Sequence, residues 1–142
     1  MEKTCLLIKP DGVAEAHIGE IVARIEQEGF ILLGMRLLRL SPSRAEAFYA
    51  IHKDRPFFNN LIEYMTSGPI VALALERDNA IGHLRDVIGA TDPREADEGT
   101  IRALFGTDIG SNTVHGSDSV ENGITETLFF FSEEEMAVLG GI

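Results

Sequence analysis

The sequence predicts one α/β domain of 142 residues, and two patterns support this fold class. Four short runs are nearly continuous in apolar residues, which is typical of strands covered on both faces. Between them, apolar residues recur three and four positions apart, as in amphipathic helices. We expect the strands at residues 5–8, 31–40, 70–75 and 128–131. Because helices separate the strands, parallel βαβ units are the default expectation, although the pattern does not fix strand direction.

Four helices follow from this spacing and from the residues that begin or end them. The first contains residues 18–25, and Gly29 offers its C-terminal stop. Ser41 is a suitable N-cap before Pro42, so we expect a second helix that continues through residue 51. The other two are expected at residues 58–65, before Ser67-Gly68-Pro69, and at residues 81–88, before Gly89.

Residues 90–119 carry little periodicity apart from a short helical turn at residues 100–105. Long irregular segments in compact domains are usually functional or disordered. The helical turn is too apolar for disorder, so we expect functional polar residues to gather in this region.

Acidic residues outnumber basic ones by 23 to 12, which gives a formal net charge of −11. Nucleic acids and anionic membranes are bound through clustered cations, so neither is expected as the main partner. A small anionic ligand is still compatible with this charge if a local basic pocket, a bound cation or backbone N–H groups receive it.

Cys5 is the only cysteine, so no disulfide can form within the chain. It lies in an apolar run, where a buried and unreactive thiol is expected. The run ends at Lys9-Pro10-Asp11, too early for a signal peptide, and no stretch approaches the roughly 20 apolar residues of a membrane span. We therefore expect a cytoplasmic protein.

Three common catalytic or metal-binding motifs do not occur in the sequence. There is no Gly-x-x-x-x-Gly-Lys-Ser/Thr phosphate loop and no Gly-x-Ser-x-Gly nucleophile elbow. The single cysteine and the four scattered histidines lack the spacing of a zinc site. Any catalytic chemistry must therefore use another arrangement.

The strongest candidate for a reactive centre is the segment Asn112-Thr113-Val114-His115-Gly116-Ser117-Asp118. Residues that favour turns and helix N-caps surround His115, so we expect a fixed backbone there. A neutral imidazole is a good nucleophile near pH 7, and a phosphoryl acceptor needs such a fixed position. The alternative is a surface loop with an incidental histidine.

Three cations lie away from the usual solvated helix faces: Lys9, Arg85 and Arg102. Lys9 follows a buried strand, and its turn could direct the ammonium into a cleft; a strand-end lysine in water is the alternative. Arg85 could instead form a surface salt bridge beside Asp86. Arg102 follows Gly99-Thr100, whose N–H and hydroxyl groups could contact a phosphate.

The segment around His115 resembles the signature of the nucleoside diphosphate kinase family, at Asn112-x-x-His115-Gly116-Ser117-Asp118. Further motifs of that family occur in order and at the right spacing: Ile8-Lys9-Pro10-Asp11-Gly12, Arg55-Pro56-Phe57-Phe58, Ser67-Gly68-Pro69, Gly89-Ala90-Thr91-Asp92-Pro93 and Gly99-Thr100-Ile101-Arg102. Each motif is weak by itself, but the ordered set is highly specific. The resemblance implies that residues 1–142 form a single domain of this family.

The resemblance implies transfer of the γ-phosphoryl group from a nucleoside triphosphate, typically ATP, to a nucleoside diphosphate, with broad base and sugar tolerance. His115 would accept the group on Nδ1 and then donate it, which is a ping-pong mechanism through phosphohistidine. A non-catalytic nucleotide-binding scaffold is the alternative, but such a protein would have lost His115 or the phosphate-binding cations. A hydrolase that releases phosphate from the same intermediate is a second alternative.

Individual roles are also implied by the resemblance. In catalysis, Glu126 would orient the imidazole, Lys9 would neutralise the moving phosphoryl group and Tyr49 would lie near it. The nucleotide would be bound by Lys9 and Asn112 at the sugar 3′-hydroxyl, by His52, Arg85, Thr91 and Arg102 at the phosphates, and by Phe57, Leu61 and Ile109 at the base, with Gly116 allowing close approach. The cofactor Mg²⁺ would ride on the nucleotide phosphates without a direct protein ligand, and Asp118 would reach it at most through water.

The fold that the resemblance implies is a ferredoxin-like βαββαβ sandwich, with an antiparallel four-stranded sheet covered by helices. This expectation takes precedence over the parallel default. The family is oligomeric, so a homo-oligomer is expected, a tetramer or a hexamer. Two departures stand out: Glu98 replaces a proline of many members, and Gly123 lies in the expected helix after His115, where glycine would cost about 1 kcal/mol relative to alanine.

Overall fold

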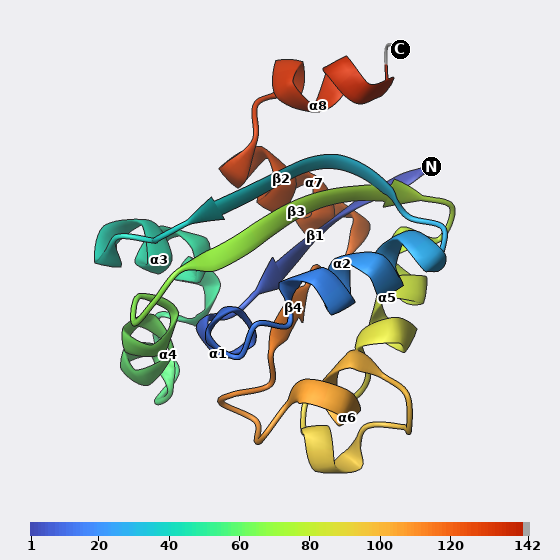
Figure 1. Cartoon of the computed structure of the whole chain (residues 1–142). Coiled ribbons are helices and arrows are strands. Elements are labelled where there is room, and N and C mark those ends of the chain that lie inside the picture. Colours follow the sequence, from blue (N-terminus) through green and yellow to red (C-terminus); the bar gives the residue numbers. More distant parts are fainter. Residues whose placement is uncertain (141–142) are drawn as a thin grey trace.

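Four antiparallel strands form the central sheet of the computed structural model, which describes the backbone of residues 1–140 and the side chains of residues 1–136. The strands are β1 (Glu2–Ile8), β2 (Ile31–Leu38), β3 (Ile70–Arg77) and β4 (Val114–Gly116), in the order β2-β3-β1-β4 (Figure 1). Every neighbouring pair is antiparallel, so the parallel default is wrong and the antiparallel expectation is confirmed. The continuous apolar runs report that both faces are covered; they carry no information on direction.

Helices cover both faces of this sheet. They are α1 (Pro10–Ala14), α2 (Ile18–Gln27), α3 (Pro42–Phe48), α4 (Phe58–Met65), α5 (Ala80–Ile88), α6 (Ile101–Phe105), α7 (Val120–Phe130) and α8 (Glu133–Gly140), with 3-10 turns at Ala50–His52 and Pro93–Glu95. Side chains of α2, α5 and α6 pack on one face of β1 and β3, and side chains of α3, α4, α7 and α8 pack on the other. Among the described residues, no helix is both long and apolar enough to cross a membrane.

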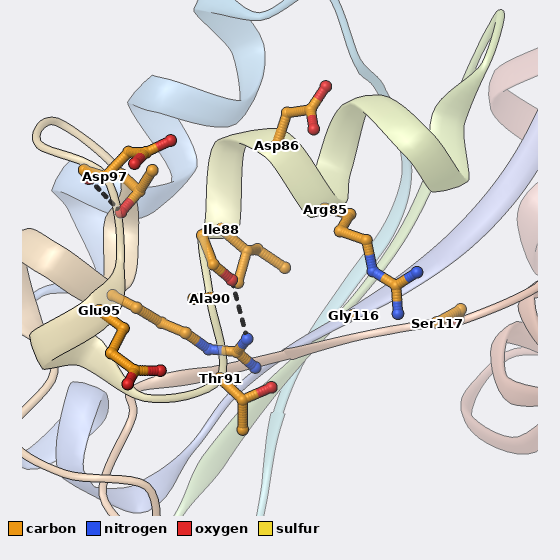
Figure 2. A pocket seen from close by; sticks show the side chains of 12 residues that line it. Arg85, Asp86, Ile88, Ala90, Thr91, Glu95, Asp97, Gly116 and Ser117 are labelled. Atoms are coloured by element: carbon orange, nitrogen blue, oxygen red, sulfur yellow. Dashed lines mark hydrogen bonds between the residues drawn. The ribbon is translucent and has the colours of Figure 1, made fainter.

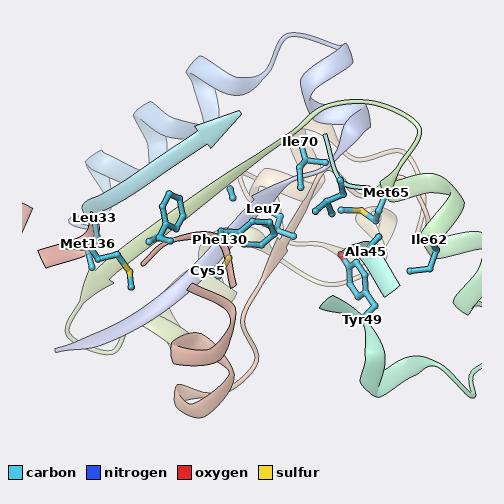
Figure 3. Packing of buried hydrophobic residues seen from close by; sticks show 14 residues of the cluster. Cys5, Leu7, Leu33, Ala45, Tyr49, Ile62, Met65, Ile70, Phe130 and Met136 are labelled. Atoms are coloured by element: carbon cyan, nitrogen blue, oxygen red, sulfur yellow. The ribbon is translucent and has the colours of Figure 1, made fainter. Parts of the chain in front are cut away.

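Alternate residues of β1 point into the two halves of the core. Cys5 and Leu7 face the half that also holds Tyr49 of the α3 end and Phe130 of α7 (Figure 3). The thiol of Cys5 is fully buried, and burial raises its pKa well above the ordinary value. The expectation of a buried thiol is therefore confirmed, and a raised pKa is what an unreactive thiol would have.

The strand expected at residues 128–131 is wrong, because residues 120–130 form α7. Gly123, Thr127 and Phe130 are the buried positions of this helix, and their spacing of four and three is helical. The fourth strand is instead Val114–Gly116, which pairs with β1. Three residues are too few to produce a readable apolar pattern, which is why the sequence did not reveal β4.

The helix expected from Ser41 through residue 51 is divided in two. Ser41 does cap α3, since its Oγ accepts a hydrogen bond from the Arg44 N–H at 3.2 Å. The helix ends at Phe48, and a 3-10 turn at Ala50–His52 follows it. This change of direction brings successive side chains from the α3 end to the same cleft, described below.

Gly123 has a packing role that its helix propensity does not reveal. A Cβ atom at this position would lie 2.1 Å from the carbonyl oxygen of Lys3, so only glycine lets α7 approach β1 this closely. The close contact holds α7, which carries Glu126, against the strand that pairs with β4. The glycine that was expected to loosen the helix thus sets the position of the helix.

Candidate active site

An open cleft of about 780 Å³ lies between the α3–α4 region, the loop before β4, and α7. It gathers residues that are far apart in the sequence and that the resemblance assigned to one site: Lys9, Tyr49, His52, Phe57, Leu61, Thr91, Arg102, Ile109, Asn112, His115, Gly116, Asp118 and Glu126. Arg85 is the one predicted site residue outside this lining. It lies in an adjoining cavity of about 560 Å³, which shares Thr91, Arg102 and Gly116 with the cleft (Figure 2).

His115 lies on β4, opposite Leu7 of β1, and its side chain is 23% exposed. Its Nε2 atom lies 2.9 Å from Oε1 of Glu126, which reaches it from α7. A carboxylate can only accept a hydrogen bond, so Nε2 carries the proton. The arrangement therefore leaves Nδ1 as the ring nitrogen with a free lone pair.

Ser117 completes this hydrogen-bonded chain, and the sequence reasoning did not assign it a role. Its Oγ donates to Oε1 of Glu126 at 2.7 Å and accepts from the Cys5 N–H at 3.0 Å. The glutamate is thus held by a side chain that β1 itself fixes. In an extended segment, side chains two positions apart lie on the same side, so His115 and Ser117 both face Glu126. The sequence could have indicated this role for Ser117 only if β4 had been recognised first.

A strained turn directs the chain into β4. Thr113 is fully buried and has a φ of 77°, and the Val114 N–H donates to the Asn112 carbonyl at 2.9 Å across it. This conformation is unusual for a β-branched residue, and such strain persists only where surrounding contacts fix it. The fixed backbone expected around His115 is therefore built by the turn at Thr113, whereas His115 itself is in a strand.

Lys9 is held by Asn112 in the wall of the cleft. Its Nζ donates to Oδ1 of Asn112 at 2.8 Å, and Nδ2 of Asn112 donates to the Thr91 carbonyl at 3.0 Å. Lys9 is only 9% exposed, so it is not a strand-end lysine in water. Burial, together with the nearby Arg102 guanidinium, lowers the pKa of Lys9 to about 8.

Arg102 and Arg85 supply positive charge at the junction of the two cavities. The guanidinium of Arg102 donates to the carbonyls of Gly89, at 3.1 Å, and Val114, at 2.9 Å. Burial and the nearby Arg85 lower the pKa of Arg102 to about 10. Arg85 forms no ion pair within the described part of the chain, and Figure 2 shows it pointing toward Ser117 rather than beside Asp86. Two cations that repel one another in one place indicate a site for an anion.

The outer end of the cleft is apolar and open. Phe57 and Ile109 line it and remain 47% and 57% exposed. The His52 ring lies 5.7 Å from the Phe57 ring, between centroids, and Leu61 lies on the same wall. Large exposed apolar side chains at a cleft entrance suit a planar ligand.

Tyr49 lies deep in the cleft, with its ring centroid 6.2 Å from that of His115. It is 6% exposed, and burial raises the pKa of its hydroxyl. That hydroxyl is buried and has no hydrogen-bond partner among the described residues. An unpaired buried donor is costly unless a ligand receives it, so it is available to a group beside His115.

The described residues contain no cluster of three or more potential metal-ligating side chains. Asp118 lines the cleft, where its carboxylate accepts a hydrogen bond from the Asn122 amide. A single carboxylate suits a cation that takes most of its oxygen ligands from water or from a bound ligand.

Several further cleft residues were missed by the sequence reasoning, and two of them, Phe48 and Tyr64, are aromatic. Phe48 ends α3 and lies against His115, and Tyr64 extends from α4. The Tyr64 hydroxyl donates to Asp11, and the Asp11 N–H donates back to that hydroxyl at 3.1 Å. This pair of hydrogen bonds ties α4 to α1, the short helix that follows Lys9 in place of the expected turn. Both residues follow helical spacing on predicted helices, so nothing in the pattern separates them from core residues.

Comparisons with known proteins agree with this geometry. The family model described as nucleoside diphosphate kinase matches residues 2–136. The chain is 54% identical to the nucleoside diphosphate kinase of Chlamydia felis over 136 residues, which is 96% of each chain. The solved structure of the Aquifex aeolicus nucleoside diphosphate kinase is similar with a TM-score of 0.93 and 44% identity, over 94% of this chain and 97% of the other.

A third relative adds a bound ligand. The nucleoside diphosphate kinase of Halobacterium salinarum, solved in complex with CDP, matches with a TM-score of 0.87 and 40% identity, over 94% of this chain and 90% of the other. The ferredoxin-like fold expected from the sequence is confirmed by these likenesses. With the family model spanning nearly the whole chain and relatives this similar, the chain belongs to the nucleoside diphosphate kinase family and has that family's kinase activity.

Proposed function

We propose that Nδ1 of His115 accepts the γ-phosphoryl group of a nucleoside triphosphate, typically ATP, and passes it to a nucleoside diphosphate. The hydrogen bond of 2.9 Å between Nε2 and Glu126 carries this proposal, because it fixes the proton on the far ring nitrogen. In the first half-reaction the Nδ1 lone pair forms a bond to phosphorus as the bond to the leaving diphosphate oxygen breaks. In the second, an oxygen of the acceptor diphosphate attacks, and the P–N electron pair returns to Nδ1.

The other residues of the cleft act by placing charge and fixing geometry, which is most of what phosphoryl transfer requires. Lys9 and Asn112 bind the sugar 3′-hydroxyl, and Lys9 also faces the moving group. Arg85, Thr91, Arg102 and His52 bind the phosphates, and the Tyr49 hydroxyl lies near the transferred group. The cation pair and the unpaired hydroxyl described above support these roles.

Mg²⁺ is proposed to arrive on the nucleotide phosphates. Asp118, a single carboxylate on the cleft wall, suits contact with such an ion through water. When bound, the ion supplies positive charge that neutralises the polyphosphate. The cations at positions 9, 85 and 102 supply the rest of the positive charge near the polyphosphate, although the chain as a whole carries a charge of −11.

The base is proposed to lie between Phe57 and Ile109, beside Leu61. These side chains are apolar, and apolar contacts discriminate between similar ligands by only about 10–200-fold. Broad tolerance of bases follows from this composition. The relative from Halobacterium salinarum was solved in complex with CDP, which supports a pyrimidine nucleoside diphosphate as one ligand of this site.

Initial-rate kinetics and a product assay test this function. Varying ATP and a diphosphate acceptor should give the parallel double-reciprocal lines of a ping-pong mechanism. With ATP and Mg²⁺ alone, release of inorganic phosphate should be slow, and added diphosphate should convert nearly all transferred phosphate into triphosphate. Rapid phosphate release that acceptor does not suppress would identify a hydrolase, and substantial turnover by His115→Ala would exclude the proposed nucleophile.

A further inference from the structure

The aromatic ring of Phe48 connects the hydrophobic core to the catalytic imidazole. It lies edge-on to the His115 ring, with centroids 5.5 Å apart and an interplanar angle of 76°. The same ring packs against Tyr49 at 4.9 Å, Phe129 at 5.3 Å and Phe130 at 5.4 Å. Phe48 also lines the cleft, so its ring has one side in the core and one side at the reaction centre.

This contact restrains a motion that the Glu126 hydrogen bond leaves free. A single hydrogen bond at Nε2 fixes one point of the imidazole, about which the ring can still tilt. Edge-to-face packing of Phe48, with Tyr49 at 84° to the imidazole plane, opposes that tilt. Because Phe130, the last residue of α7, packs against Phe48 in turn, the restraint is backed by the helix that also carries Glu126.

Phe48 also differs from its neighbours in chemistry. Tyr49, His52, Asn112 and Glu126 each bring a polar group into the cleft, whereas Phe48 brings only C–H edges. A hydrocarbon surface beside His115 cannot bind or align a water molecule. The acceptor nucleotide does not need such a site, because its own contacts align the attacking oxygen.

We propose that Phe48 is a positioning residue that favours transfer of the His115 phosphoryl group to a nucleotide over transfer to water, an inference that rests on the proposed function. In transfer, an oxygen of the diphosphate forms the new P–O bond as the P–N bond breaks. In leakage, a water oxygen forms that bond and releases a proton, and phosphate is the product. Phe48 holds the imidazole where the bound nucleotide reaches phosphorus, and its own surface offers water no polar partner.

Phe48→Leu tests this inference, with Phe129→Leu as the matched control. Both variants remove one ring from the same aromatic cluster, but no ring contact joins Phe129 to His115 within the described residues. Phe48→Met, which keeps volume without a ring, serves as a second variant should Phe48→Leu fold poorly. Purified phosphoenzyme is followed in buffer alone, and its transfer to ADP is followed by quenched flow.

The ratio of hydrolysis to transfer is the decisive readout, because a loss of stability alone does not change it. An aromatic edge contact corresponds to roughly a 3- to 10-fold effect, so the ratio should rise by about that factor in Phe48→Leu and Phe48→Met. It should stay within twofold of wild type in Phe129→Leu, with ADP affinity unchanged throughout. An unchanged ratio in both ring-deleted variants, or an equal rise in Phe129→Leu, would overturn the inference. Failure of the wild type to form phosphoenzyme would instead refute the proposed function.

Discussion

Lys9 is a charged side chain in a nearly dry position, so its protonation couples catalysis to pH. Its pKa is lowered to about 8, whereas its pKa in the unfolded chain is near 10.5. The proposed role in binding phosphate and sugar requires the ammonium form. We therefore expect kcat/KM, which reports free enzyme, to fall as the pH rises through about 8. A pH profile that stays flat to pH 10 would contradict this role for Lys9.

The lowered pKa of Lys9 should affect stability in the opposite direction: activity falls as the pH rises, whereas the Lys9 contribution to the free energy of unfolding increases. Between pH 8 and 10.5 the unfolded chain retains the Lys9 proton that the folded chain has lost, so this group's contribution to the free energy of unfolding rises with pH. Below pH 8 both states carry the proton, and the contribution is constant. Urea unfolding measures the free energy of unfolding of wild type and of Lys9→Met across this pH range. The value for wild type minus the value for Lys9→Met should rise with pH, because only wild type carries the Lys9 amine.

Glu126 accepts hydrogen bonds from both His115 and Ser117 at one oxygen. In Glu126→Gln the neutral amide can no longer stabilise positive charge on the imidazole, so phosphorylation and dephosphorylation of His115 should slow together by about 10–1000-fold. Nucleotide affinity should change little, because Glu126 is assigned no nucleotide contact. Single-turnover kinetics measures both. Ser117→Ala removes the hydroxyl that donates to Glu126 and accepts from the Cys5 N–H, but it keeps the carboxylate beside His115, so it should slow the reaction less. Wild-type rates in Glu126→Gln would remove the residue from the mechanism.

The site residues that could be predicted from the sequence are those whose polar side chains differ from their apolar surroundings. His115, Lys9 and Arg102 stand out as polar groups in or beside apolar runs, and the family motifs supplied the rest. Ser117 and Phe48 were not predictable in the same way. The role of Ser117 depends on the register of a three-residue strand, and the role of Phe48 depends on where a helix ends. Both are set by packing between distant segments, which periodicity does not contain.

At the scale of an element, Gly123 fixes the distance between α7 and β1. In Gly123→Ala the new methyl would meet the Lys3 carbonyl, so we expect a loss of roughly 1–3 kcal/mol or more in the free energy of unfolding. Glu126 is carried by the same helix and would move, so phosphoryl transfer should slow as well. Chemical denaturation and single-turnover kinetics measure the two effects.

Gly19 in α2 is the matched control for this substitution. Nothing lies within 4 Å of a Cβ built there, so Gly19→Ala should stabilise the protein by about 0.4–1 kcal/mol through helix propensity. If Gly123→Ala also proved neutral or stabilising, α7 would not be held against β1 as described.

Elements were predictable where an apolar stripe or a cap marks them. The strands at β1, β2 and β3 and the helices after Ser41 and before Gly89 follow from such signals. Residues 128–131 show the limit, because an apolar run of four is compatible with a strand or with a buried helix end. The helix is selected by Ser119, whose side chain accepts the Asn122 N–H at its start, and by the glycine contact with β1.

At the scale of the whole molecule, β2 is an edge strand with an apolar outer surface. Met35 and Leu37 are 57% and 64% exposed on it, and an exposed apolar edge favours association. We propose a homo-oligomer, a tetramer or a hexamer, of one-domain chains in the cytoplasm. Sedimentation velocity should detect the oligomer at micromolar concentration, and Met35→Lys with Leu37→Lys should shift it toward monomer. Glu46→Lys on α3, another exposed site, is the charge-matched control. A wild-type monomer would contradict the proposal.

The identity of the phosphorylated nitrogen tests the central claim most directly. Phosphorus NMR of the enzyme isolated after incubation with ATP and Mg²⁺, with the chain denatured in base, distinguishes the two phosphohistidine isomers. Because Glu126 holds the proton on Nε2, the prediction is one phosphate per chain, on Nδ1 of His115, stable to base, labile to acid and absent from His115→Ala. Phosphate on Nε2, on another residue, or retained in His115→Ala would contradict the account.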